Sequence, residues 1–124
     1  MAVPAPSAAA LFYDPRCGPC TLFALVAEWT SGSRVRALPY DGKEAERDLG
    51  DLTEEDRFAY AHVVDANGRR SGASIMAPLV EHTLGPEAGH VLERAPALDQ
   101  GLRWVYRRFW NYRWTHGCGA LGRS

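Results

Sequence analysis

Two cysteines near the N-terminus, with the residues that flank them, constrain the fold more than any other feature of the chain. An apolar and aromatic run, Ala10–Asp14, is typical of a short buried strand that ends at a loop. The loop carries Cys17 and Cys20, and Pro19 between them suits the first turn of a helix. The sequence therefore predicts a strand, a cysteine-bearing turn and a helix, in that order. Four apolar residues at helical spacing define this helix: Leu22, Leu25, Val26 and Trp29.

The middle of the chain supplies the next predicted elements. Gly32 is a natural stop for the first helix. Arg34–Asp41 is predicted to be a second strand, and Lys43–Leu49 an acidic helix that Gly50 ends. A further short turn, capped by a threonine and an aspartate, is expected after it at Thr53 and Asp56.

A β-hairpin is predicted at Asn67-Gly68, because these residues readily adopt the positive φ angles of a two-residue type I′ turn. Its strands are expected at 60–66 and 69–73. A helix over 74–84 follows, with Pro78 tolerated if the helix starts late, and a last helix runs from 97 to 114. This order predicts an α/β fold: a four-stranded mixed sheet flanked by helices, with an extra C-terminal helix. Because the cysteine pair lies at the first strand-to-helix junction, the order resembles the thioredoxin arrangement, and we expect a thioredoxin-like fold.

Composition limits the classes of function that the chain can have. Its 124 residues fit one domain, predicted over 10–124 after a flexible arm at 1–9. A net charge of −1 gives no general attraction to nucleic acid, and no stretch approaches the length of apolar sequence that spans a membrane. The N-terminus lacks the features of a secretory signal, and three cysteines do not make a secreted disulfide framework. We therefore expect a cytoplasmic protein whose cysteine pair is catalytic or metal-binding.

The cysteine pair has the spacing of a thiol–disulfide redox couple. A helix N-terminus favours an anion, so it lowers a thiol pKa from its usual value of about 8.5 and makes Cys17 the expected nucleophile. Cys20, one turn further on, is expected to point inward and resolve a mixed disulfide. Arg16 adds a cation if its side chain turns toward the sulfur, and Asp14 either exchanges a proton or caps the loop. The structural alternative is two buried thiols that pack as small apolar groups.

The motif resembles two known groups of proteins. Gly18 and Pro19 complete the Cys-Gly-Pro-Cys sequence of thioredoxin itself. The wider stretch "YDPRCGPC" is similar to the signature of the DCC (DUF393) family, a tyrosine-aspartate-glycine-x-cysteine-x-x-cysteine pattern, with Pro15 in place of the glycine. The last helix is similar to the family's ending. The matching residues are Tyr13, Asp14, Cys17, Cys20, Tyr106, Asn111 and Cys118.

The resemblance implies a thioredoxin-like oxidoreductase that needs no cofactor. Its partners would be a protein or small-molecule thiol or disulfide substrate and an external reductant. Thioredoxins place a cis-proline before the third strand, whereas no proline precedes "YAHVVDA" here. The substrate-binding backbone of thioredoxin is therefore expected to be absent or replaced.

A third cysteine raises a metal-binding alternative. Cys118 and His116 near the C-terminus would complete a Cys₃His set with Cys17 and Cys20, and such a set suits zinc or another thiophilic metal. This requires the C-terminal tail to fold back to the start of the first helix. Cys118 could instead capture a disulfide from the pair. The remaining histidines, at 62, 82 and 90, are expected to be structural or exposed.

The last helix presents a second candidate surface. Its predicted inward face carries Leu98, Leu102, Val105, Phe109 and Tyr112. The opposite face carries Trp104, Trp110 and Trp114, interleaved with Arg103, Arg107 and Asn111. Exposed tryptophans beside arginines would suit a protein partner, a homodimer or a membrane interface. Alternatively, the two ends of the chain cover these rings.

Overall fold

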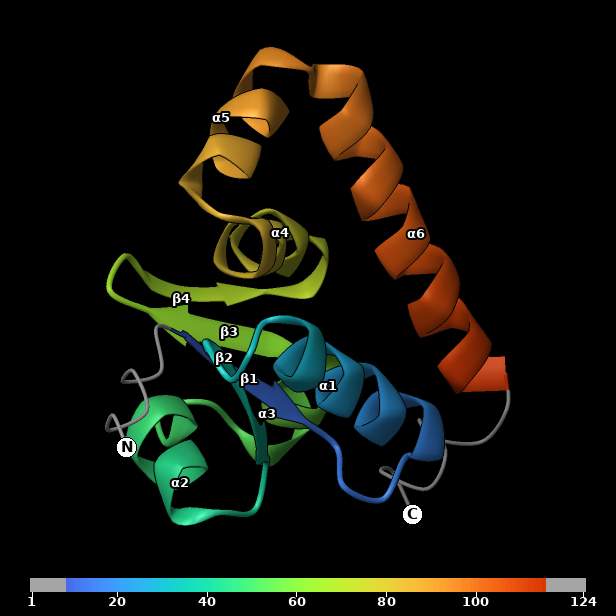
Figure 1. Ribbon diagram of the computed structural model, residues 1–124. Helices are drawn as coiled ribbons and strands as arrows, with labels where there is room; N and C mark the ends of the chain where they lie inside the picture. Colours follow the sequence, from blue (N-terminus) through green and yellow to red (C-terminus); the bar gives the residue numbers. More distant parts are fainter. Residues whose placement is uncertain (1–8, 116–124) are drawn as a thin grey trace.

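The computed structural model describes residues 9–115, with side chains through residue 112, and contains a four-stranded mixed sheet (Figure 1). The strands are β1 (Ala9–Tyr13), β2 (Val35–Pro39), β3 (His62–Asp65) and β4 (Gly68–Ser71). Their order across the sheet is β2-β1-β3-β4. β1 pairs with β2 in parallel and with β3 antiparallel, and β3 pairs antiparallel with β4. The predicted α/β class and mixed sheet are confirmed.

The helices cover both faces of this sheet. They are α1 (Gly18–Thr30), α2 (Lys43–Leu49), α3 (Glu54–Ala59), α4 (Met76–Leu84), α5 (Pro86–Arg94) and α6 (Pro96–Thr115). A 3₁₀ turn, Gly72–Ile75, joins β4 to α4. Figure 1 shows α4, α5 and the long α6 on one side of the sheet, and α2 with α3 at the opposite end of the molecule. None of the helices within residues 9–115 combines the length and apolar composition needed to cross a bilayer.

The core is divided in two by the sheet. Side chains of a strand alternate between its faces, so Leu11 and Phe12, both fully buried, belong to different clusters. Leu11 packs with residues of α1, α4 and α6. Phe12 packs with Leu38, Tyr40 and residues of α2. Both faces of β1 are therefore covered by helices.

Local capping signals predicted the short helices well. α2 spans Lys43–Leu49 with Gly50 after it, as expected. The Thr53 hydroxyl accepts the N–H of Asp56 at 3.1 Å, which begins α3. β1 begins one residue earlier than expected, because Ala9 is buried and pairs with Val35. α5 was not predicted, since its sequence is polar and contains Gly89.

The hairpin forms, but its turn differs from the predicted one. Asp65 pairs with Gly68, so Ala66 and Asn67 form the loop instead of Asn67-Gly68. Asn67 donates its backbone N–H to Asp65 Oδ1 at 2.9 Å, and Gly68, with φ of 112°, takes the positive angle at the start of β4. The aspartate side chain and the glycine thus set the turn one residue earlier.

The expected packing face of α6 is confirmed for Phe109, which packs against the core, but is wrong for other residues. Val105 and Tyr112, which were predicted to face inward, are 51% and 49% exposed, whereas Tyr106 and Trp110 are buried. Every face of this helix carries an aromatic residue, so spacing alone does not identify the face that packs. Tyr106 and Trp110 face inward because each buries a ring and supplies a polar atom to a backbone group of the segment before β3.

Candidate functional site

The cysteine pair lies at the junction of β1 and α1, where Asp14 turns the chain. Asp14 Oδ1 accepts the backbone N–H of Arg16 at 2.9 Å, and the Asp14 carbonyl accepts the N–H of Cys17 at 3.1 Å. These two bonds reverse the chain within three residues of the strand end. Cys17 is consequently the N-cap of α1, with extended backbone angles of φ −105° and ψ 115°.

The cysteines share the first turn of α1. The backbone N–H of Cys20 donates to Cys17 Sγ at 3.4 Å, so the sulfur occupies the place that a serine or aspartate oxygen takes in other helix caps. Thr21 then closes the turn, because both its N–H and its hydroxyl donate to the Cys17 carbonyl, at 3.0 and 2.9 Å. Pro19 lies in the first turn, as predicted. The turn therefore points an N–H donor at the first sulfur.

Both cysteines are buried, with 0% of Cys17 and 3% of Cys20 exposed. They belong to the apolar cluster that also contains Tyr106 and Trp110 of α6. α6 reaches this end of α1 through Phe109, whose ring centroid lies 5.5 Å from that of Phe23. The first sulfur is thus at a helix N-terminus as expected, but it lies inside the core and not on an open surface.

Asp14 and Arg16 contact each other. Asp14 is 1% exposed, and Arg16 Nε lies 3.4 Å from its Oδ1. The Arg16 guanidinium also stacks over the ring of Phe58, 4.5 Å from the ring centroid. Asp14 therefore has the loop-capping geometry that was one of its two predicted roles. Gly18 is exposed, and a Cβ added there would meet no atom within 4 Å.

Three aromatic side chains fix the segment that precedes β3. Trp110 Nε1 donates to the Ala59 carbonyl at 2.8 Å, and the Ala61 N–H donates to the Tyr106 hydroxyl at 3.3 Å. The Tyr40 hydroxyl donates to the carbonyl of the intervening Tyr60. These contacts correct the prediction of an exposed tryptophan face. Trp104 is 61% exposed, but Trp110 is only 7% exposed, and the Trp114 side chain lies outside the described residues.

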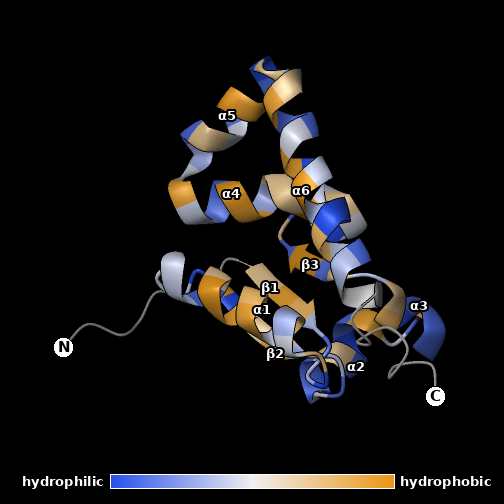
Figure 2. Ribbon diagram, turned by 90° about the vertical axis from the view of Figure 1, so that its right-hand side faces the viewer, coloured by the Kyte–Doolittle hydropathy of each residue, from blue (hydrophilic) through white to orange (hydrophobic). Residues whose placement is uncertain are grey.

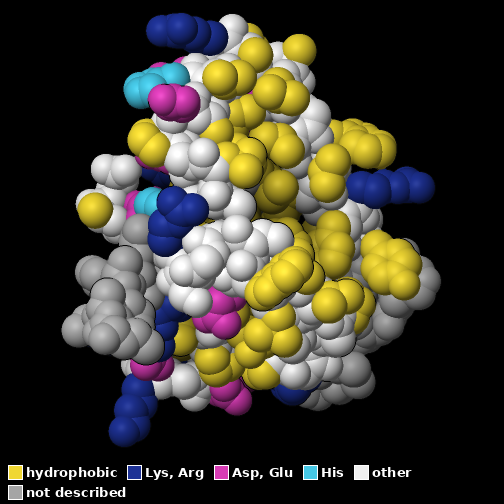
Figure 3. All heavy atoms as spheres, in the orientation of Figure 1, with side chains coloured by type: hydrophobic (Ala, Val, Ile, Leu, Met, Phe, Trp, Pro, Cys, Tyr) yellow, Lys and Arg dark blue, Asp and Glu magenta, His cyan; other side chains and the backbone are white. Residues whose placement is uncertain are grey.

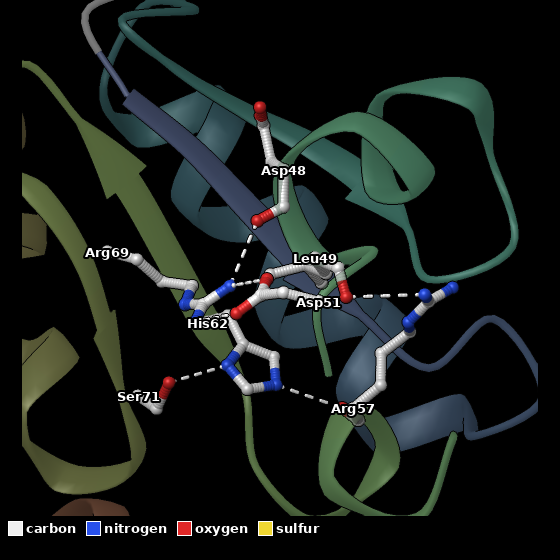
Figure 4. Close-up of polar contacts among 7 residues, drawn as sticks. All are labelled: Asp48, Leu49, Asp51, Arg57, His62, Arg69 and Ser71. Carbon is white, nitrogen blue, oxygen red and sulfur yellow. Dashed lines mark hydrogen bonds and ion pairs between the residues drawn. The ribbon is translucent and has the colours of Figure 1, made fainter. Parts of the chain in front are cut away.

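A polar cluster that was not predicted lies around His62, the first residue of β3 (Figure 4). His62 is buried, with Nδ1 2.6 Å from Ser71 Oγ and Nε2 3.0 Å from the Arg57 carbonyl oxygen. A carbonyl only accepts, so Nε2 carries the ring proton and Nδ1 accepts from the Ser71 hydroxyl. Burial lowers the pKa of His62, since it disfavours the charged ring.

Charged side chains surround this histidine. Arg69 makes a bidentate pair with Asp51, at 2.6 and 2.8 Å, and this hydrogen bonding lowers the pKa of Asp51 to about 2. Arg57 donates to Glu46 Oε1 at 2.8 Å and to the Leu49 carbonyl at 3.3 Å. Cross-strand pairing places His62 opposite Ser71. The spacing of these residues in the sequence does not predict the cluster, because its members come from α2, α3 and both hairpin strands.

Of the four residues in the metal-binding alternative, the structure describes only Cys17 and Cys20. His116 and Cys118 lie outside the described residues. Within 9–115, no group of three or more histidine, cysteine, aspartate or glutamate residues has an arrangement that could hold a metal ion. His82 pairs with Asp65 at 3.1 Å, and His90 lies 3.8 Å from Glu93.

Two hollows lie away from the cysteines. One, of about 320 Å³, is lined by residues of the sheet and of α2, including Arg36, Arg47 and Asp48. The other, of about 340 Å³, lies between α4, α5 and the start of α6, with Glu81 and Asp99 in its wall. Neither is lined by Cys17 or Cys20, so neither is a substrate pocket for the pair.

Comparison with known proteins finds no relative of this chain. It matches no protein-family model, no curated protein and no solved structure.

Proposed function

We propose that the chain is a cytoplasmic thiol–disulfide oxidoreductase of thioredoxin-like architecture, as its resemblance to the DCC family implies. Cys17 is the nucleophile and Cys20 the resolving thiol. The observation that carries the proposal is the position of Cys17 at the N-cap of α1, where its Sγ accepts the N–H of Cys20 at 3.4 Å. Cys17 is disulfide-bonded in the structure and Cys20 is reduced; once a thiol reductant has cleaved that bond, the N–H that donates to Cys17 Sγ stabilises its thiolate.

The proposed reaction is a two-step exchange with a disulfide R–S–S–R′. Cys17 thiolate attacks one substrate sulfur, the substrate S–S bond breaks, and R′–S⁻ leaves and takes a proton from solvent. Cys20 loses its proton and attacks Cys17 Sγ, which releases R–S⁻ and forms the Cys17–Cys20 disulfide. The substrate gains two electrons and the pair loses two. An external thiol reductant returns them.

Local structure supports this division of roles. The two residues are three positions apart in one helical turn, so the resolving step is intramolecular and has a high effective concentration. Asp14, buried at the end of β1, holds the loop and is the nearest acid in sequence to the pair. Arg16 helps to hold the loop through Asp14, since its guanidinium contacts that carboxylate and the ring of Phe58.

Burial sets a condition on the reaction. A disulfide substrate must approach Cys17 Sγ along the S–S axis, and a residue that is 0% exposed offers no such path. Exchange therefore requires an opening of the core at the start of α1. The apolar cluster that would have to open includes Tyr106 and Trp110 of α6.

Trapping of a mixed disulfide tests the proposal. In a Cys118→Ser background, Cys20→Ser should accumulate a covalent adduct with a small disulfide such as oxidised glutathione, because the resolving thiol is missing. Cys17→Ser, the matched control, should accumulate none. In the structure Cys17 is disulfide-bonded and Cys20 takes no part in that bond, so after full reduction and reoxidation by the disulfide substrate, mapping of the parent should find Cys17 joined to Cys20. Equal behaviour of the two variants, or Cys17 joined to Cys118 alone, would show that the pair does not work as proposed.

The pH dependence of alkylation separates a redox pair from two packed thiols. Through the local opening at the start of α1, reduced Cys17 should react with iodoacetamide without unfolding of the whole chain, and its rate should follow a pKa below about 8.5, because the helix end stabilises the thiolate. A structural pair would react only as fast as the protein unfolds. The readout is the alkylation rate of the Cys20→Ser, Cys118→Ser variant from about pH 5 to about pH 9.5.

A further inference from the structure

The outer face of α1 is apolar. The four residues whose spacing predicted this helix, here called the α1 stripe, all point to solvent: Leu22 is 64% exposed, Leu25 48%, Val26 46% and Trp29 82%. The inner face carries Cys20 and Ala24, which are buried. Figure 2 shows α1 coloured mainly as hydrophobic, and Figure 3 shows hydrophobic side chains gathered over the side of the molecule on which α1 lies. Isolated exposed leucines are common on monomers, but a continuous stripe is typical of a contact surface.

The α1 stripe carries no charge. The only ionisable acid or base in α1 besides Cys20 is Glu28, and its Oε1 accepts the backbone N–H of Ala37 at 3.1 Å. The first turn holds no acidic residue and the last turn no basic one. Because no charge lies along the stripe, an acidic or basic peptide gains no ion pair there. The surface fits an equally apolar and uncharged helix.

We propose that the α1 stripe binds a second copy of itself, so that two chains pair through antiparallel α1 helices about a two-fold axis. The positions 22, 25, 26 and 29 are symmetric about the point between Leu25 and Val26. In this arrangement Leu22 of one copy lies opposite Trp29 of the other, so each end of the contact pairs one large ring with one smaller side chain. The two helix macrodipoles run in opposite directions, which favours the pairing.

The size of the stripe sets the expected strength of this dimer. A standard interface uses about 20–30 residues from each side, whereas the stripe offers four large side chains. Leu84, 72% exposed at the end of α4, extends the surface at one end: Arg34, just after α1, donates to the carbonyl of the neighbouring Thr83 at 3.3 Å. We therefore expect a weak, reversible dimer with a dissociation constant of about 10–100 μM.

Sedimentation equilibrium of the full chain tests this, with a reductant present so that no intermolecular disulfide contributes. Between about 1 and 500 μM, the average mass of the parent should rise from 13.7 kDa toward twice that value. Leu25→Glu should raise the dissociation constant at least about tenfold, because it buries a carboxylate at the centre of the contact. Leu98→Glu is the matched control, since Leu98 is 50% exposed and lies on α6. It should leave the association unchanged.

Three outcomes would overturn the proposal. The first is a parent that keeps its monomer mass across the whole range, and the second is an equal effect of Leu25→Glu and Leu98→Glu. The third is a monomeric parent whose tryptophan emission shifts to the blue with neutral phosphatidylcholine vesicles, a shift that Trp29→Ser abolishes, which would assign the stripe to a membrane surface. Trp29→Ser serves in place of Leu25→Glu if circular dichroism shows that the glutamate variant is unfolded. The result does not depend on the cysteines and leaves the proposed reaction untouched.

Discussion

The segment around the start of β3 is held on one side by aromatic rings and on the other by charged groups. On the interior side, Trp110 and Tyr106 of α6 bond the backbone of Ala59 and Ala61. These rings are 7% and 5% exposed. On the outer side, Arg69 pairs with an Asp51 side chain that is 66% exposed. The outer side has the more conspicuous polar contacts, but the interior side buries far more apolar surface.

This difference indicates where the stability of the segment comes from. A buried ring contributes its own transfer free energy and also shields the hydrogen bond it makes. An exposed ion pair replaces good hydration with an attraction that water and salt screen. The number of charged contacts in Figure 4 is therefore a poor guide to their energetic weight. We expect the interior side to dominate the free energy of unfolding.

Trp110→Ala should produce the largest loss of stability. The substitution removes a buried ring whose centroid lies 5.3 Å from that of the stacked Tyr106 ring, and so leaves a cavity next to Tyr106. It also leaves the Ala59 carbonyl without its indole donor. We expect a loss of about 3–5 kcal/mol in the free energy of unfolding, measured by urea denaturation.

Trp104→Ala is the matched control on the same helix. Trp104 is 61% exposed, so its removal should change the free energy of unfolding by no more than about 0.5 kcal/mol. Equal losses for the two variants would contradict the interior assignment of Trp110. They would instead support a tryptophan face on which both rings are covered to the same degree.

The parts of the fold that depend on local chemistry could be predicted from the sequence. α2 ends where Gly50 follows it, and α3 begins where the Thr53 hydroxyl meets the N–H of Asp56. Pro78 lies in the first turn of α4 because a 3₁₀ turn precedes that helix. Each of these signals acts over three or four residues, so the rest of the chain does not alter it. The hairpin turn was displaced because the Asp65 side chain competed with the Asn-Gly preference.

The packing face of α6 could not be predicted, because the choice depends on distant residues. Val105 and Tyr106 are both apolar enough to face inward, and the pattern favoured the wrong one. The backbone groups of Ala59 and Ala61 decide the matter, since they need partners that Trp110 and Tyr106 supply. These partners are 51 and 45 residues away in sequence.

The candidate site was predicted in position but not in environment. The strand–turn–helix placement of Cys17 follows from residues within a few positions of it. Its burial depends on the packing of α1 against the sheet and α6. The polar cluster of His62, Arg69 and Asp51 was missed for the same reason, since only the folded chain brings those residues together.

Acidification should produce the second largest loss of stability, through His62. Burial lowers the folded-state pKa of this ring, so below about pH 6.5 the unfolded chain binds more protons than the folded chain. Stability is therefore fully present above the unfolded pKa and is lost as the pH falls below it. A single proton changes the free energy of unfolding by at most about 1.4 kcal/mol per pH unit.

The measurement is urea denaturation of the parent, His62→Gln and His90→Gln at several values from about pH 7.5 to about pH 5. His62→Gln should lose less stability on acidification than the parent, whatever its stability at neutral pH. His90, with a side chain 68% exposed, provides the control and should keep the slope of the parent. A parent-like slope in His62→Gln would mean that the ring titrates normally and is not sealed between Ser71 and Arg57.

Asp51→Asn should produce the smallest loss of stability, because the ion pair that it weakens is exposed to solvent. The asparagine keeps an acceptor for Arg69 but loses the charge, so the loss of stability at neutral pH should be slight and should vanish at about 1 M salt, where screening is nearly complete. The folded-state pKa of Asp51 is about 2 against an ordinary value of 3.8. Its stabilisation is therefore present above about pH 3.8 and disappears as the pH falls toward 2, where parent and variant should become equal. Asp41→Asn, an exposed change in the same acidic part of the chain, is the control. A salt-insensitive loss that exceeds the loss in Trp110→Ala would reverse the comparison, because it would place the main support of β3 on its charged side.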